Sequence, residues 1–260
     1  MRRQPRAGLW PGKLLLAKAG CGRSCAEVFA LAMLLLFAGP KLLPAAETQQ
    51  WDELKLVGQL TSHVDIFAAT TLRLATVNPV LNRVSGQVGL NLRPVTWLTL
   101  SPNYQSISND PATDTGAYEH RPGIVSAIGI PIRSTKVILS AGLEYRVREG
   151  QPNSWRLRPK VTVQHPLGPS SWKLTGYLAN ELFFESDEVG LARNRFYAGI
   201  QKTLGENWSA NFYYCRQHDP RSSDPNLNII GISMTLDFDL RRNLGVVGDN
   251  PLTGKNGGLE

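Results

Sequence analysis

The chain has 260 residues, with 28 lysines and arginines against 21 aspartates and glutamates, and a formal charge of +7. Most of this excess lies in residues 1–46, which hold seven basic residues and one acidic residue, so the remainder is close to neutral. This distribution argues against a nucleic-acid-binding protein, and the longest apolar run, Val28–Gly39 with 12 residues, is too short for a membrane-spanning helix.

Residues 1–46 have the three parts of a secretory signal peptide: a basic stretch, the apolar run Val28–Gly39, and small residues at positions 44–46. We expect cleavage after residue 45 or 46 and export through the inner membrane. Two of the three cysteines lie in this segment, so the exported chain keeps only Cys215 and is expected to form no internal disulfide.

From residue 64 onward, apolar and polar residues alternate with period two, in segments of ten to fourteen residues. In residues 136–148, Leu139 and Leu143 fall on one face of a strand, whereas Glu144 and Arg146 fall on the other. The same alternation recurs in later segments: 155–164, 208–217 and 230–238. The pattern predicts a series of β-strands.

The connections between these segments alternate in length. Short ones lie near residues 94, 132, 168 and 206, and longer polar ones near 112, 151, 189 and 221. The strands that follow the short turns begin near Trp97, Thr135, Trp172 and Trp208, at spacings of 38, 37 and 36 residues. This indicates a hairpin repeat with tight turns at one end, expected to face the periplasm, and long loops at the other.

Alternating strands fit either a soluble sandwich or barrel with an apolar interior, or a membrane barrel with an apolar exterior. The strand lengths match those of bilayer-spanning strands, tryptophans follow the tight turns as in an aromatic girdle, and charges occur in mid-strand on the polar face. We therefore predict an all-β fold: an antiparallel up-and-down transmembrane β-barrel of about 10 to 12 strands, spanning residues 47–238, with a flexible C-terminal tail at 239–260.

Two features fit this barrel less well. Pro102, Pro122 and Pro159 lie inside predicted strands, where each removes a hydrogen-bond donor, so we expect β-bulges at these positions. Residues 64–238 hold ten predicted strands, and residues 51–60 are an eleventh candidate. Because membrane barrels of this kind have even strand numbers, the first strand should be an inner or edge element, or one strand has been missed.

Charged residues at alternate positions should line the lumen, and they would make it net positive. They are Glu119, Arg121, Glu144, Arg146, Arg148, Arg156, Arg158, Lys160, Glu181, Arg193 and Arg195. One interpretation is a pore that attracts anions, or a site for an acidic ligand. The other is a ladder of cross-strand ion pairs that fills a narrow lumen.

No catalytic or metal site is expected. The four histidines, His63, His120, His165 and His218, are scattered, and alternation places His120 on the opposite face from its charged neighbours. The sequence contains no nucleophile elbow, metal-binding histidine pair or phosphate-binding loop. We therefore predict neither an enzyme nor a bound cofactor.

Four short motifs resemble a bacterial outer-membrane barrel family catalogued as domain of unknown function 2490. They are Glu119-His120-Arg121, Asn180-Glu181-Leu182-Phe183, Arg193-Asn194-Arg195 and the terminal Leu236-Asp237-Phe238. The resemblance covers roughly residues 51–238. It implies an outer-membrane location in a Gram-negative envelope, with outer-membrane lipid and the barrel assembly machinery as partners, and it implies no reaction. A departure is that 22 residues follow Phe238, where such barrels commonly end.

The sequence thus favours an outer-membrane β-barrel that acts as a small porin-like pore or as a ligand-binding barrel with a charged lumen. An outer-membrane enzyme acting on lipid or lipopolysaccharide is one alternative. A soluble periplasmic β-barrel that binds an apolar ligand is another. The sequence names no small-molecule ligand.

Overall fold

The computed structural model describes residues 47–75, 81–109, 111, 117–187, 190–221 and 226–241. The predicted signal peptide and most of the predicted tail lie outside the described residues. None of the described residues forms a helix that is long and apolar enough to cross a membrane. The described part contains eleven strands: β1 Glu47–Gln59, β2 Val64–Ala75, β3 Leu81–Val95, β4 Leu98–Asn109, β5 Tyr118–Ile132, β6 Thr135–Arg148, β7 Ser154–Pro166, β8 Leu174–Glu185, β9 Leu191–Thr203, β10 Trp208–His218 and β11 Asn226–Asp239.

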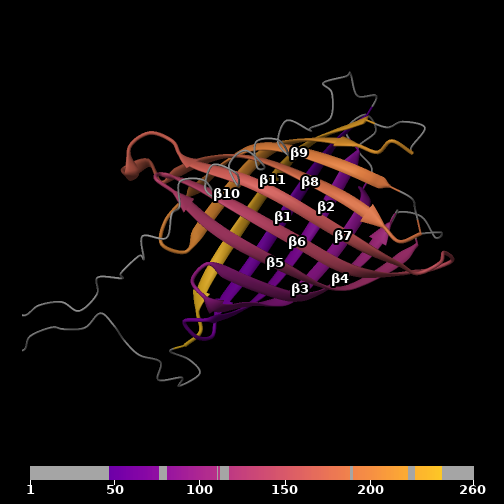
Figure 1. Ribbon diagram of the computed structural model, residues 1–260, viewed down its shortest axis with the longest axis horizontal. Coiled ribbons are helices and arrows are strands. Elements are labelled where there is room, and N and C mark those ends of the chain that lie inside the picture. The colour runs from indigo at the N-terminus through magenta and orange to yellow at the C-terminus, as the bar shows by residue number, and fades with distance from the viewer. Residues whose placement is uncertain are drawn as a thin grey trace, which may run out of the picture.

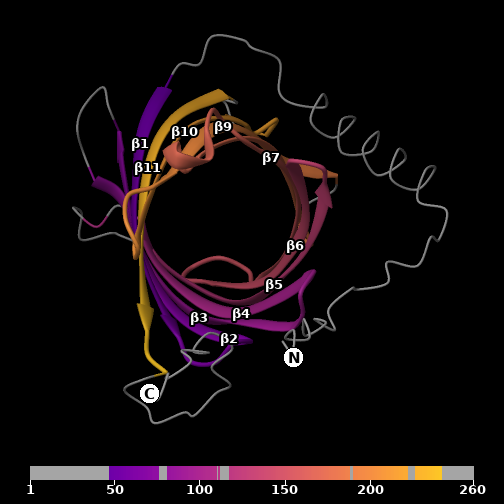
Figure 2. The same cartoon turned by 90° about the vertical axis from the view of Figure 1, so that its left-hand side faces the viewer.

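The strands form one closed barrel, shown from the side in Figure 1 and along its axis in Figure 2. Each strand from β1 to β11 pairs with the next in antiparallel orientation, and β1 closes the ring by pairing in parallel with β11. The prediction of an all-β barrel with 10 to 12 strands is confirmed. Closure leaves no strand edge with unpaired N–H and C=O groups.

The parallel pair explains the odd strand number. From the sequence we expected β1 to be an inner or edge element, or one strand to have been missed. Instead, β1 is a full barrel strand that pairs with β11 from Glu47↔Leu227 to Gln59↔Asp239. An odd ring of strands that otherwise alternate in direction must contain one parallel pair. The two ends of the described chain therefore lie at opposite ends of the barrel.

We call the two ends of the barrel the turn end and the loop end. At the turn end, short segments join β1 to β2, β3 to β4, β5 to β6, β7 to β8 and β9 to β10. The longest of these contains a short 3-10 helix, Ser170–Trp172, followed by Lys173 in the left-handed conformation. The remaining five connections and Glu47 lie at the loop end, and Asp239 lies at the turn end.

No register shift lies at Pro102, Pro122 or Pro159, so the bulges that we expected at these prolines do not occur. Pairing is continuous in register across Pro122 between β5 and β6, and across Pro159 between β7 and β8, with only the residue pairs at and beside each proline missing. Register shifts occur elsewhere, between Arg73 and Leu74, Leu92 and Val95, and Phe183 and Phe184. The barrel therefore tolerates a missing backbone donor as a local gap between two strands.

Tyrosine rings cross from one strand to a glycine on the next at two places on the inner wall. Tyr177 pairs with Gly199, and a Cβ atom at Gly199 would lie 2.7 Å from the tyrosine ring. Tyr213 pairs with Gly231 in the same way and leaves no space for a side chain there. Each glycine thus provides the space that a ring needs to lie flat on the sheet.

The barrel is apolar outside. Large hydrophobic side chains are exposed in mid-strand on nearly every strand: Leu54, Leu56, Ile66, Leu72, Val88, Ile124, Ile128, Leu143, Leu157, Leu178, Ile200, Phe212, Ile230, Ile232 and Met234. Exposed aromatic rings lie at both ends. The turn end has Trp97, Trp172, Trp208 and Phe238, and the loop end has Tyr118, Trp155 and Phe184.

Candidate functional site: the charged lumen

Charged side chains lie on the inner face because side chains alternate along each strand. β7 shows this clearly: Arg156 is 4% exposed, whereas its neighbours Trp155 and Leu157 are 52% and 45% exposed. Glu119 and Arg121 in β5 are likewise buried, on either side of the exposed His120. The wall of the lumen is thus built from residues that alternate with the apolar outer band.

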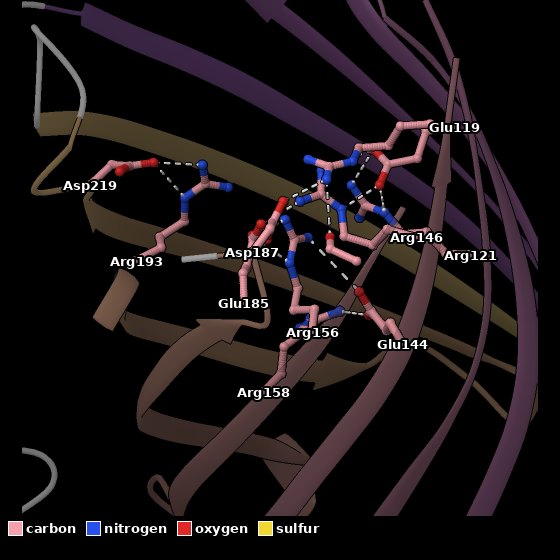
Figure 3. A network of polar contacts seen from close by, with 12 residues as sticks. Glu119, Arg121, Glu144, Arg146, Arg156, Arg158, Glu185, Asp187, Arg193 and Asp219 are labelled. Carbon is pink, nitrogen blue, oxygen red and sulfur yellow. Dashed lines mark hydrogen bonds and ion pairs between the residues drawn. The ribbon is translucent and has the colours of Figure 1, made fainter. Parts of the chain in front are cut away.

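A network on β5–β8, which we call the ion-pair belt, contains four carboxylates and four guanidinium groups. Its members are Glu119, Arg121, Glu144, Arg146, Arg156, Arg158, Glu181 and Glu185. Figure 3 shows most of these side chains converging from neighbouring strands. The belt carries equal numbers of positive and negative charges.

One half of the belt is centred on Glu119 and Glu185. Arg121 donates two hydrogen bonds of 2.8 Å to Glu119, one to each carboxylate oxygen. Arg146 also binds Glu119, and its Nη1 donates to Glu185 at 2.6 Å. Arg156 Nε donates to the other oxygen of Glu185 at 2.8 Å. Each carboxylate is thus shared between two arginines, which satisfies most of its acceptor positions.

The other half of the belt is centred on Arg158. This guanidinium contacts Glu144 on β6 and Glu181 on β8, with an Nη2–Oε1 distance of 2.7 Å to Glu181. Tyr197 donates its hydroxyl to the second oxygen of Glu181 at 2.9 Å. Arg156 lies 3.9 Å from Glu144 and so links the two halves. The belt is a continuous chain of contacts across four strands.

Buried aromatic rings fill the middle of the lumen beside the belt. Phe183, only 2% exposed, has four guanidinium groups within 6 Å of its ring centre, at 5.7, 5.1, 5.9 and 4.8 Å, from Arg156, Arg158, Arg193 and Arg195 respectively. Such contacts favour cations over the ring face. Beside it, the inner faces of β1 and β8–β11 carry an apolar cluster: Trp51, Ala179, Tyr197, Cys215 and Ile229.

Two polar cavities lie in the lumen, one in the loop half and one in the turn half. The loop-end cavity, which we call the arginine chamber, has a volume of about 260 Å³, and its lining is Gln49, Trp51, Arg73, Asn82, Arg83, Asn109, Arg193, Arg195, Gln217 and Leu227. A cavity of about 300 Å³ lies in the turn half, lined by residues that include Glu53, Lys55, Lys160, Thr162, Gln164 and Gln201. The two cavities share no lining residue.

A family comparison adds an independent finding. The model for the family described as "Protein of unknown function (DUF2490)" matches residues 48–228. The chain belongs to the DUF2490 family. The resemblance that we drew from short motifs is thereby confirmed. A comparison with curated proteins found no match to this chain.

The structure places the eleven sequence-predicted lumen residues of this DUF2490 barrel in four groups. Seven of them belong to the ion-pair belt: Glu119, Arg121, Glu144, Arg146, Arg156, Arg158 and Glu181. Arg193 and Arg195 line the arginine chamber, and Lys160 lines the turn-half cavity with its Nζ 4.5 Å from the Tyr197 ring centre. Arg148 lies at the loop end and pairs with Asp187 at 2.6 Å.

Sequence reasoning missed several charged residues of the DUF2490 lumen and its rim, among them Glu53 and Lys55 of the turn-half cavity. Glu185, Asp187 and Asp219 neutralise arginines that we had counted as excess positive charge. Arg73 and Arg83 add positive charge in the chamber. Simple alternation would have found Glu185, which follows Glu181 and Phe183 at even spacing. Asp187 and Asp219 lie beyond strand ends, where alternation gives no signal.

The Asp187 carboxylate is outside the strands and has a lowered pKa. Burial is the largest single influence and raises the pKa, but the hydrogen bond from Arg148, a bond to its own backbone N–H and the nearby positive charges together outweigh it. The acid is therefore held in its charged form beside Arg148.

The histidines of this DUF2490 member are dispersed among neutral partners. His120 contacts the Tyr104 hydroxyl at 2.6 Å, His165 contacts Thr135, and His218 contacts Asn226. His63 contacts the adjacent Ser62 at 2.8 Å. Within the described ranges, no group of three or more histidine, cysteine, aspartate or glutamate residues is arranged to hold a metal ion.

Proposed function

We propose that this chain is an outer-membrane barrel of the bacterial envelope whose lumen is closed across its middle, and that it binds small polar ligands in the lumen. The observation that carries the proposal is the set of paired and packed side chains in the lumen, together with two cavities, one in each half, that share no lining residue. An open channel needs a continuous aqueous path, whereas here charged groups of β5–β9 and the rings of Phe183 and Trp51 contact one another inside the lumen.

Three features support a membrane location. Mid-strand apolar side chains are exposed around the barrel, and aromatic rings are exposed at both ends, as in membrane barrels. The strands have 11 to 15 residues, enough to cross a bilayer at a tilt. A soluble barrel that binds an apolar ligand would instead have apolar side chains inside, but here the inner face carries the ion-pair belt.

The balance of charges supports a closed lumen. Every carboxylate in the belt contacts at least one arginine, and the interior of a barrel has a lower effective dielectric constant than water, which strengthens these contacts. Opening a path would separate several such pairs at once. We therefore assign the belt a structural role and the arginine chamber a binding role.

Whether the lumen is closed is tested by recording currents across planar bilayers that contain the purified barrel. We expect no steady conductance at low or high salt. Phe183→Ala combined with Arg158→Ala should open a path and produce measurable current, whereas Lys202→Ala on the exposed end of β9 should not. Steady current in the unaltered protein with a preference for anions would favour a pore instead.

Location and orientation are tested in cells. The protein should fractionate with outer membranes and migrate differently on a gel before and after heating. In a Cys215→Ser background, a membrane-impermeant thiol reagent should label Gln151→Cys in the loop-end connection and should not label Glu206→Cys at the turn end. Release with the soluble periplasmic contents would contradict the membrane location, and labelling only at position 206 would reverse the orientation.

A further inference from the structure

The arginine chamber differs from the rest of the lumen in its charge. Four guanidinium groups line it, from Arg73, Arg83, Arg193 and Arg195, and no acidic residue is among its lining residues. Only Arg193 has a carboxylate partner, Asp219 at 2.7 Å, and Figure 3 shows this pair apart from the belt. The chamber is a concentration of positive charge that the described residues neutralise only in part.

The other three guanidinium groups have neutral partners. Arg83 Nε donates to Asn109 at 2.7 Å, and Arg195 Nε donates to Gln217 at 2.8 Å. Arg73 lies over the Trp51 ring at 3.7 Å from its centre, and its Nε is buried with no acceptor among the described residues. Guanidinium donors therefore remain available to an additional acceptor.

These like charges are held close together. Arg73 and Arg83 are direct partners across β2 and β3, and Arg195 lies 4.8 Å from the same Trp51 ring that Arg73 covers. Like charges directly opposite each other in a sheet are destabilising. The nearest belt carboxylates, Glu119 and Glu181, are already engaged by Arg121, Arg146 and Arg158. A ligand with negative charge would relieve this repulsion.

We propose that the arginine chamber is a binding site for a soluble oxyanion of the phosphate type. Guanidinium groups match the oxygens of phosphate with paired, charge-assisted hydrogen bonds, and Asn82 and Asn109 add amide groups at the wall. The volume of about 260 Å³ equals roughly eight water molecules of liquid, which accommodates phosphate with a short organic group attached. The site deepens the proposed function, on which it rests, by naming the class of ligand.

The test is isothermal titration of inorganic phosphate into the full chain in neutral detergent at low ionic strength. We expect saturable binding with one site for each barrel, weaker at high salt because of screening. Arg73→Gln and Arg83→Gln should each weaken binding at least about tenfold. Lys55→Gln, which removes one positive charge from the turn-half cavity, is the matched control and should leave the affinity unchanged.

Two outcomes would overturn the site. One is the absence of saturable binding. The other is an equal loss of affinity in Lys55→Gln and Arg73→Gln, since a general charge effect would then explain the data. Heat-modifiable migration shows whether each variant is folded. Thermal unfolding gives a second readout, because phosphate should raise the melting temperature of the unaltered protein and of Lys55→Gln but not of the Arg73→Gln, Arg83→Gln double variant.

A second experiment, with lipid vesicles, distinguishes a soluble phosphate ligand from the phosphate headgroup of a lipid. Adding phosphatidic acid to phosphatidylcholine vesicles should change the stability of the unaltered protein and of Arg73→Gln by the same amount. Stabilisation by phosphatidic acid that depends on Arg73, without binding of inorganic phosphate, would overturn the soluble ligand in favour of a lipid headgroup. Phosphate binding with steady conductance would contradict only the closed lumen, and a closed lumen without phosphate binding would contradict only this site.

Discussion

The ion-pair belt and the arginine chamber are both built from arginine side chains on the inner face of the barrel, but the two groups of arginines have different roles. In the belt, four guanidinium groups meet four carboxylates, so the charges are satisfied within the protein. In the chamber, four guanidinium groups have one carboxylate partner among the described residues, Asp219. A buried charge network is stable when every member is paired. The comparison shows that the neighbours of an arginine, rather than the arginine itself, distinguish a structural part of the lumen from a binding part.

The largest expected effect comes from breaking the belt. Glu181→Gln removes the carboxylate that Arg158 and Tyr197 share and leaves Arg158 with Glu144 alone. Breaking a buried pair from one side costs about 3 to 5 kcal/mol. Urea unfolding of the barrel in lipid vesicles measures this loss. A change below about 1 kcal/mol would mean that water satisfies the belt, and the structural role would fail.

The next prediction compares the loss of stability from a substitution on the outer face of β6 with that from one on its inner face. Leu143→Arg places a charge on the apolar exterior, where an arginine near the middle of a bilayer costs about 2 to 4 kcal/mol. Arg146→Ala, on the inner face of the same strand, should cost less, because Glu119 keeps Arg121 and Glu185 keeps Arg156. Unfolding in vesicles compares the two. Equal tolerance at both positions would show that the faces are assigned the wrong way round.

Removing an arginine from the chamber should have a small effect on the free energy of unfolding, in the opposite direction to the two losses above. Arg73→Gln takes away a charge that has no carboxylate partner in the described residues and faces Arg83. We expect the free energy of unfolding without phosphate to stay unchanged or to rise by up to about 1 kcal/mol. The same unfolding assay measures it. A loss comparable to that of Glu181→Gln would erase the difference between chamber and belt.

The smallest effect is expected at the rim, where Asp187 pairs with Arg148. Because the pKa of Asp187 is lowered in the folded protein, its contribution is present above the ordinary carboxylate pKa and is lost as the pH falls through the folded value. The pair lies at the rim and Asp187 is exposed to solvent, so its contribution is at most about 1 kcal/mol. Denaturant midpoints of the unaltered protein and Asp187→Asn should differ at pH 6 and converge near pH 2. A constant difference would assign the effect to hydrogen bonding alone.

The sequence by itself determined the strands and their faces. Alternation with period two is a local property, so it located the lumen side of Glu144 and Arg156 and the outer side of Leu143 and Trp155, and it separated short turns from long loops. The number of strands was also accessible, because residues 51–60 carried a recognisable eleventh pattern. The prediction of bulges at the prolines was wrong, because the barrel tolerates a missing backbone donor without a change of register.

Only the tertiary structure decided which side chains contact one another in the lumen. Arg146 reaches Glu185, 39 residues away, and the parallel pairing of β1 with β11 brings residues from the two ends of the barrel domain together. That closure places Trp51 of β1 between Arg73 of β2 and Arg195 of β9. Such partners depend on the register around a closed ring, which no local pattern encodes. For this reason the sequence showed that the lumen is charged, but not that one part is balanced and another is open to an anion.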